Sequence, residues 1–207
     1  MIPRFYPIVD TAATALHDGE VTEVAKALLD AGVRMLQYRH KENWTQQHYD
    51  EAASIAELGR SAGAAFVVND RADYAHLLEA GVHLGQDDLP PVAARKIMGN
   101  VALMGFSTHN RRQLLLGAEE PVQYLAIGPI FPTTSKLKPD PALGLDRLKT
   151  FRALTDKPLV AIGGIRLDNA ASVFEAGVDA VATISGFLID GSEAGKVTAS
   201  AKRWLSL

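Results

Sequence analysis

Short apolar segments rich in valine, isoleucine, leucine and phenylalanine recur along the whole chain. Each ends next to glycine or a polar residue, as buried strands of a parallel sheet do. The predicted strands are FYPIV at 5–9, MLQY at 35–38, AFVV at 65–68, VHLG at 82–85, VALMGF at 101–106, QYLAIG at 123–128, PLVAIG at 158–163 and AVATI at 180–184. The hydrophobic pattern therefore predicts eight strands.

The segments between these strands have the spacing of amphipathic helices. Apolar residues fall three or four positions apart, for example at Val21, Val24 and Leu28. Several of these segments end in an alanine and a glycine, and we expect Gly32, Gly81 and Gly177 to cap helices in the left-handed conformation. Alternating strands and helices predict parallel strands joined by crossover helices. Eight such units predict an α/β fold, a single (β/α)8 TIM barrel domain over residues 1–207.

Composition narrows the choice of partners. The chain of 207 residues is 47% hydrophobic and 22% charged, so it can bury a core. A net charge of -3 argues against nucleic acid or an anionic membrane as the main partner. There is no cysteine, which excludes disulfides, a thiolate nucleophile and cysteine-bound metals. We see no export signal and no apolar run long enough to span a membrane. We therefore expect a cytoplasmic protein with small-molecule ligands, and a homo-oligomer is compatible with the sequence.

In a barrel of this kind the chemistry lies where strands end, so polar residues there carry information. After the second strand, alternation sends Gln37, Arg39 and Lys41 to one side. Two cations and an amide are typical of a site that binds a polyanion. The alternative is an exposed run of charge.

The third and fourth strands end in acidic residues. Asn69 and Asp70 follow one, and Gln86, Asp87 and Asp88 follow the other. Without soft ligands, two carboxylates on adjacent loops favour Mg²⁺, which binds oxygen and bridges to phosphate. We take Asp70 and Asp88 as the metal ligands. Asp87 is an alternative ligand, and either acid could instead cap the next helix.

The fifth and sixth strands end in hydroxyl groups. Ser107 and His109 suggest a nucleophilic pair, but such close placement in sequence rarely gives the required geometry and no third member can be named. We expect Ser107 to bind a phosphate oxygen, and Asn110 or Thr108 to cap the next helix. The longest loop follows the sixth strand, and its Thr133, Thr134, Ser135 and Lys136 could bind a second anionic ligand. It could also be a flexible surface turn.

The last two strands end in glycine-containing segments. Gly163 and Gly164 follow the seventh strand, and Ser185 and Gly186 follow the eighth. Glycine lets backbone amides approach a ligand, and many barrels bind a monophosphate at this position. These residues predict a phosphorylated ligand without identifying the reaction.

Taken in order, the strand ends resemble those of the bacterial thiamine phosphate synthase family over nearly the whole chain. The resemblance rests on FYPIVD, QYRHK, NDR, HLGQDD, GFSTH, GPIFPTTSK, AIGGI and the closing Ile184-Ser185. It implies a Mg²⁺-dependent transferase that joins hydroxymethylpyrimidine diphosphate to a thiazole carboxylate phosphate. The products would be thiamine phosphate, diphosphate and CO₂, formed by dissociative displacement.

The resemblance also implies roles for particular residues. The pyrimidine diphosphate would be held by Gln37, Tyr38, Arg39, His40, Lys41, Asn69, Ser107 and Lys136. Among these, the catalytic set would be Arg39, Lys41, Ser107 and Lys136. The thiazole phosphate would be held by Thr133, Thr134, Ser135, Gly164, Ile184 and Ser185. Asp70 and Asp88 would hold Mg²⁺.

Two positions depart from the family's pattern. Ser135 stands where threonine is usual but keeps the hydroxyl, and Phe187 could reshape the wall near the phosphate. Two other functions are compatible with the sequence. One is the thiazole tautomerase branch of the same family, with His109 as the base. The other is a non-catalytic sensor of thiamine precursors. The pyrimidine diphosphate site argues against both.

Overall fold

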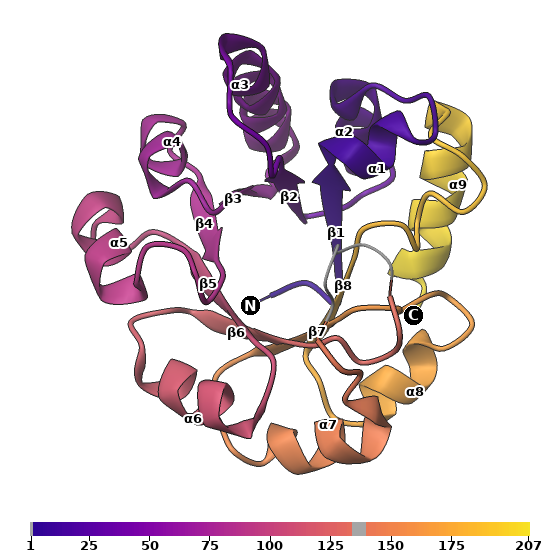
Figure 1. The fold of residues 1–207 in the computed structure, drawn as a ribbon. Helices are drawn as coiled ribbons and strands as arrows, with labels where there is room; N and C mark the ends of the chain where they lie inside the picture. Colours follow the sequence, from indigo (N-terminus) through magenta and orange to yellow (C-terminus); the bar gives the residue numbers. More distant parts are fainter. Residues whose placement is uncertain (1, 134–139) are drawn as a thin grey trace.

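The computed structural model describes residues 2–133 and 140–207. Strands and helices alternate along the chain (Figure 1). The strands are β1 (Phe5–Asp10), β2 (Met35–Arg39), β3 (Ala65–Asn69), β4 (Gly81–Leu84), β5 (Met104–Thr108), β6 (Tyr124–Ile127), β7 (Leu159–Ile162) and β8 (Ala180–Thr183). The helices are α1 (Thr11–Ala15), α2 (Val21–Asp30), α3 (Gln46–Ala62), α4 (Ala72–Leu77), α5 (Pro91–Met98), α6 (Arg111–Glu119), α7 (Gly144–Arg152), α8 (Ala170–Glu175) and α9 (Ala194–Leu205).

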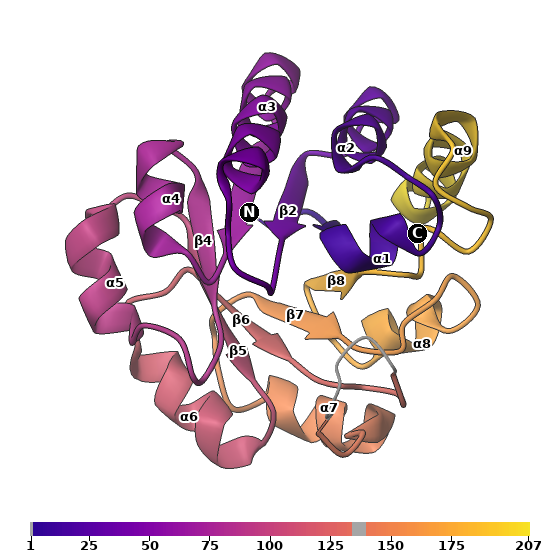
Figure 2. The ribbon, with the colours of Figure 1, turned by 45° about the horizontal axis from the view of Figure 1, so that its top comes forward.

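The strands form one closed parallel barrel. Each strand pairs with the next in sequence, and β8 pairs with β1. The helices surround this barrel, and α9 lies beside α2 so that the last helix meets the first ones (Figures 1 and 2). The predicted (β/α)8 barrel and its eight strands are confirmed.

Side-chain alternation divides the apolar residues into two layers. On β1, Phe5 and Val9 pack outward against the helices, whereas Tyr6 and Ile8 fill the barrel interior. Aromatic stacking fixes the last helix on the outer layer, because the Trp204 ring of α9 lies 5.1 Å from that of Phe5 with an interplanar angle of 8°. On β1 and β2 the inward series ends in polar residues, Asp10 and Arg39, at the mouth of the barrel.

Two local predictions were wrong. The fifth strand begins at Met104 and not at Val101, whose side chain is 98% exposed. The hydrophobic pattern extended the predicted strand back to Val101, but the fold does not bury that side chain. Gly81 does not cap a helix either. It lies inside β4, where a Cβ atom would be 2.9 Å from the Leu103 carbonyl oxygen, and Glu79 takes the positive φ of 53° after α4. Gly32 and Gly177 do have positive φ, as expected.

Among the residues that the structure describes, no helix has the length and apolar character needed to cross a membrane. The parallel order of the strands has a more direct consequence for function. All eight carboxyl ends open at the same end of the barrel, so the residues that follow them are brought together.

Candidate functional site

Two cations from β2 and the following loop lie at the mouth. The inward series of this strand runs from Met35 through Gln37 to Arg39, so the predicted alternation is confirmed. The Arg39 guanidinium donates to the carboxylate of Asp10 at the end of β1. Asp10 is 5% exposed and also caps α1, where it accepts from the Ala13 amide at 2.8 Å. Asp10 therefore fixes the direction of Arg39.

The second cation contacts the predicted metal ligands. The Lys41 Nζ atom lies 2.5 Å from a carboxylate oxygen of Asp70, and the Asp88 carboxyl lies beside that of Asp70. Burial and the neighbouring Asp88 raise the pKa of Asp70 to about 6, against the opposing effect of Lys41. Two acids from adjacent loops are thus held together despite their like charge, and a bound cation would relieve that repulsion.

Neither acid caps the helix that follows it. The N-cap of α4 is Arg71 and that of α5 is Pro90, and neither helix has a side-chain cap. Asp88 instead accepts from the Gly85 amide at 2.7 Å, within its own loop. The paired carboxylates supply hard oxygen donors. Among the described residues, no group of three or more histidine or acidic side chains could hold a metal ion.

Polar residues of β3 and β5 complete this half of the mouth. Asn69 is 5% exposed, and its side-chain nitrogen is buried without a hydrogen-bond partner among the described residues. Such an atom is costly unless a ligand supplies an acceptor. The Ser107 hydroxyl is 2.9 Å from Nε2 of His83, a β4 residue to which the sequence gave no role. The structure therefore brings Gln37, Arg39, Lys41, Asn69, Asp70, Asp88 and Ser107 to one side of the mouth.

The side chains of Tyr38 and His40 are not brought there. Alternation turns Tyr38 outward, and its hydroxyl donates to Glu51 of α3 at 2.7 Å. His40 stacks on His48 with ring centroids 3.6 Å apart, and its Nδ1 is 2.8 Å from the Thr11 hydroxyl. The side chains of both residues therefore contact helix residues on the outer side of the strand and do not reach the mouth.

Ser107 in β5 and His109 just after it contact different partners. The His109 Nδ1 donates to the Gly128 carbonyl at 2.7 Å, away from the serine, which bonds His83. Asn110 caps α6 by accepting from the Gln113 amide at 3.0 Å, as predicted. The structure gives no Ser107–His109 pair, which agrees with the rejection of a nucleophilic mechanism there.

The loop after β6 packs on the glycines after β7. The Phe131 amide donates to the Gly163 carbonyl at 3.0 Å. At Gly164, where φ is +66°, a Cβ atom would meet the Pro132 carbonyl oxygen at 2.6 Å. Glycine is thus required there, and the close packing carries Thr133 toward Gly164. The predicted ligands Thr134, Ser135 and Lys136 lie outside the described residues.

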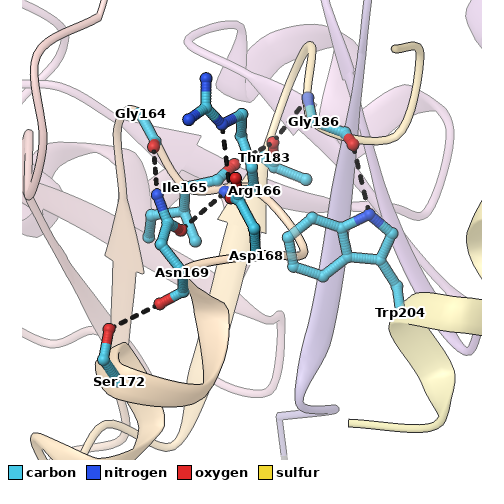
Figure 3. A network of polar contacts seen from close by, with 9 residues as sticks. All are labelled: Gly164, Ile165, Arg166, Asp168, Asn169, Ser172, Thr183, Gly186 and Trp204. Atoms are coloured by element: carbon cyan, nitrogen blue, oxygen red, sulfur yellow. Dashed lines mark hydrogen bonds and ion pairs between the residues drawn. The ribbon is translucent and has the colours of Figure 1, made fainter. Parts of the chain in front are cut away.

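Hydrogen bonds join the loop after β7 to the turn after β8 (Figure 3). The Thr183 hydroxyl donates to the Ile165 carbonyl at 3.3 Å and accepts from the Gly186 amide at 3.0 Å. Asn169 donates to the Gly164 carbonyl at 3.1 Å. The predicted phosphate residues Gly164, Ile184 and Ser185 therefore lie on two loops that Thr183 holds together.

Sequence reasoning missed the residues that support the site. Asp10, His83 and Thr183 contact other site residues, and each lies at a strand end, which was the available signal. Phe187 is fully buried in the layer between barrel and helices, so its side chain packs behind the phosphate loops and does not line the mouth.

The fold and this mouth define the class of protein. It is a (β/α)8 barrel that presents cations, paired carboxylates and glycine-bordered loops at the carboxyl ends of its strands, an arrangement suited to phosphorylated small molecules. The chain belongs to the thiamine monophosphate synthase family, whose model matches residues 5–187.

Individual relatives agree with this assignment. The chain is 46% identical over 192 residues to the thiamine-phosphate synthase of Koribacter versatilis, covering 91% of this chain and 90% of that one. It is 41% identical over 205 residues to the thiamine-phosphate synthase of Chloroflexus aurantiacus, covering 99% and 92%. Among solved structures, a thiamine phosphate pyrophosphorylase from Pyrococcus furiosus is 29% identical with a TM-score of 0.83, covering 98% of this chain and 95% of the other.

Proposed function

We propose that this chain is a thiamine-phosphate synthase, a transferase that joins hydroxymethylpyrimidine diphosphate to thiazole carboxylate phosphate. Thiamine phosphate, diphosphate and CO₂ are the products. Family membership supports the activity, and the observation that carries it is the contact of Lys41 with the Asp70–Asp88 pair. A cation beside paired acids matches a diphosphate that binds together with a divalent metal ion.

Mg²⁺ is the proposed cofactor, with Asp70 and Asp88 as its protein ligands. When bound, it supplies positive charge that neutralises the diphosphate oxygens. Asp87 is the less suitable ligand, because it is exposed and Asp88 is the acid that contacts Asp70.

The residues of the chain then stabilise the leaving group. Arg39 and Lys41 face the developing negative charge, and Ser107 donates a hydrogen bond to it, with Lys136 predicted to add a third cation. Asp10 keeps Arg39 directed at the mouth. The aminopyrimidine ring can stabilise a benzylic-type cation, so the displacement is dissociative. The thiazole nitrogen carries no proton, and no general base is needed.

The second substrate binds on the opposite loops. Gly164, Ile184 and Ser185 border the phosphate, and Thr133, Thr134 and Ser135 supply hydroxyl groups to it. The support for this placement is the packing of the segment before Thr133 on Gly164 and the link between the two loops through Thr183. The thiazole would thus lie across the mouth from the pyrimidine diphosphate. Loss of CO₂ after bond formation restores the aromatic ring.

A coupling assay tests this proposal and separates it from the alternatives. The purified chain is mixed with both substrates and Mg²⁺, and the thiazole and thiamine products are resolved by chromatography. A synthase forms thiamine phosphate, a tautomerase only isomerises the thiazole, and a sensor forms neither. Isomerised thiazole without thiamine phosphate would therefore reject the proposal.

Two substitutions test the proposed residues in the same assay. Lys136→Ala and Asp88→Ala should remain folded by circular dichroism and lose most turnover. Asp87→Ala, which removes the exposed neighbouring acid, is the matched control for Asp88→Ala and should retain activity. Full activity of either of the first two variants would remove that residue from the mechanism.

A further inference from the structure

A continuous chain of hydrogen bonds crosses the barrel interior beneath the mouth. The Gln37 side-chain nitrogen donates to the Tyr6 hydroxyl at 2.8 Å, and this hydroxyl is 3.0 Å from that of Tyr124. The Tyr124 hydroxyl is 3.0 Å from Nδ1 of His83, whose Nε2 is 2.9 Å from the Ser107 hydroxyl. The chain therefore joins β2 to β5 through residues of β1, β6 and β4.

The surroundings keep this chain in place. Both tyrosines are at most 1% exposed, and His83 is 8% exposed. A Cβ atom on Gly105 would lie 2.0 Å from the Tyr124 ring, so only glycine leaves room for this tyrosine beside β5. Burial raises the pKa of both phenols, so each hydroxyl keeps the hydrogen that it shares with its neighbour.

The amide at one end sets the direction of the whole chain. The nitrogen of Gln37 can only donate, so the Tyr6 oxygen accepts and the Tyr6 hydrogen is left to bond Tyr124. The same argument then applies to Tyr124, whose hydrogen passes to Nδ1 of His83. A reversed bond would leave a buried hydroxyl hydrogen unused, which is costly.

Because Nδ1 of His83 accepts from Tyr124, the ring carries its hydrogen on Nε2 and donates it to Ser107. Ser107 accepts that bond, and its own hydrogen is free to point to the mouth, toward an anionic oxygen. Without a fixed tautomer, the serine could equally donate backward to His83 and present only lone pairs to the ligand.

We propose that Tyr6, Tyr124 and His83 are positioning residues that fix Ser107 as a hydrogen-bond donor to the departing diphosphate. The direction of the hydrogen bonds follows from these side chains alone, whereas the catalytic effect of that direction rests on the proposed function. Tyr124 is the most informative position, because Tyr124→Phe removes one hydroxyl and keeps the ring that packs on Gly105.

The first test measures the His83 tautomer directly by ¹⁵N NMR of protein labelled at histidine, assigned with a His83→Gln variant. We expect a protonated Nε2 and an unprotonated Nδ1 in the native chain, and loss of this single state in Tyr124→Phe. Thr108→Val is the matched control. This variant also deletes a buried hydroxyl of β5, which donates to the Ala126 carbonyl at 2.8 Å and takes no part in the hydrogen bonds through His83. It should leave the His83 signals unchanged.

The second test is a double-mutant cycle in the coupling assay. Tyr124→Phe should lower kcat about tenfold, the effect of misdirecting one hydrogen bond, with little change in KM. In a Ser107→Ala background the same substitution should have no further effect, because the group that it directs is gone.

The two tests fail in different ways. A native His83 protonated on Nδ1 would overturn the proposed direction whether or not the chain is a synthase. An equal loss of kcat with and without Ser107 would show that Tyr124 acts on structure alone and would overturn the positioning role. If Tyr124→Phe does not fold, Tyr6→Phe breaks the same chain one bond earlier, and the tautomer of the native protein still decides the question. No thiamine phosphate from the native chain would reject the proposed function and leave the tautomer result standing.

Discussion

The paired acids at the mouth should make the protein less stable as the pH rises, and Asp70→Asn tests this. The pKa of Asp70 is raised from 3.8 to about 6 in the folded protein, by burial first and then by Asp88. A carboxyl with a raised pKa holds its proton more tightly in the folded state than in the unfolded one. The free energy of the folded state therefore rises relative to that of the unfolded state, and stability falls, as the pH rises from about 4 through 6.

The size of the effect follows from the two pKa values. The cost of the Asp70 carboxylate grows from under about 1 kcal/mol at pH 4 to about 3 kcal/mol at pH 8. Asparagine removes the charge and suits the positive φ of 65° at this position. Asp70→Asn should thus gain about 2 kcal/mol over the native protein between pH 4 and pH 8, without divalent cations.

Urea unfolding at several pH values measures this difference. Asp73→Asn is the matched control. Arg71 lowers the pKa of Asp73, so its charge is favourable in the folded state and that variant should lose stability at pH 8. Added Mg²⁺ should stabilise the native protein and not Asp70→Asn. If Asp70→Asn is instead less stable than the native protein at pH 8, the contact with Lys41 outweighs burial and the reasoning is refuted.

Three further predictions concern residues that support the site and the fold. Asp10→Asn keeps an α1 cap but weakens the contact that directs Arg39. In steady-state kinetics, kcat/KM for the pyrimidine diphosphate should fall about tenfold. Unchanged kinetics would contradict this prediction. Thr183→Val removes the bonds between the two phosphate loops, so KM for the thiazole phosphate should rise about fivefold while that for the other substrate stays constant. An equal rise in both KM values would indicate general loosening. Trp204→Ala removes the stacking on Phe5 and should lower the free energy of unfolding, measured by urea titration, by about 3 to 5 kcal/mol. A measured loss well below about 1 kcal/mol would disprove this prediction.

The sequence predicted the barrel because strands buried on both faces have a clear pattern. Continuous apolar runs separated by helical spacing allow few other folds, and the strand ends could be located within a few residues. Val101 is the exception. An apolar residue next to a strand looks like part of it, and only the packing shows that this side chain is exposed.

The site was predicted less completely, for physical reasons. Alternation on β2 gave the inward direction of Gln37 and Arg39, but the predicted range of adjacent residues also included Tyr38 and His40, which face α3. Some residues bind no ligand themselves but support a residue that does. Their residue type alone does not reveal this role. His83 reaches Ser107 and Asp10 reaches Arg39 only because the barrel closes, and sequence spacing does not show those contacts.

The central claim is that the two halves of the mouth hold two phosphorylated substrates for one coupling reaction. The most direct measurement quantifies thiamine phosphate and diphosphate formed by the purified chain with both substrates and Mg²⁺. We predict equal amounts of the two products, none without the metal ion, and most of the turnover lost in Asp88→Ala but not in Asp87→Ala. Diphosphate release without thiamine phosphate, or no product at all from the native chain, would contradict the account.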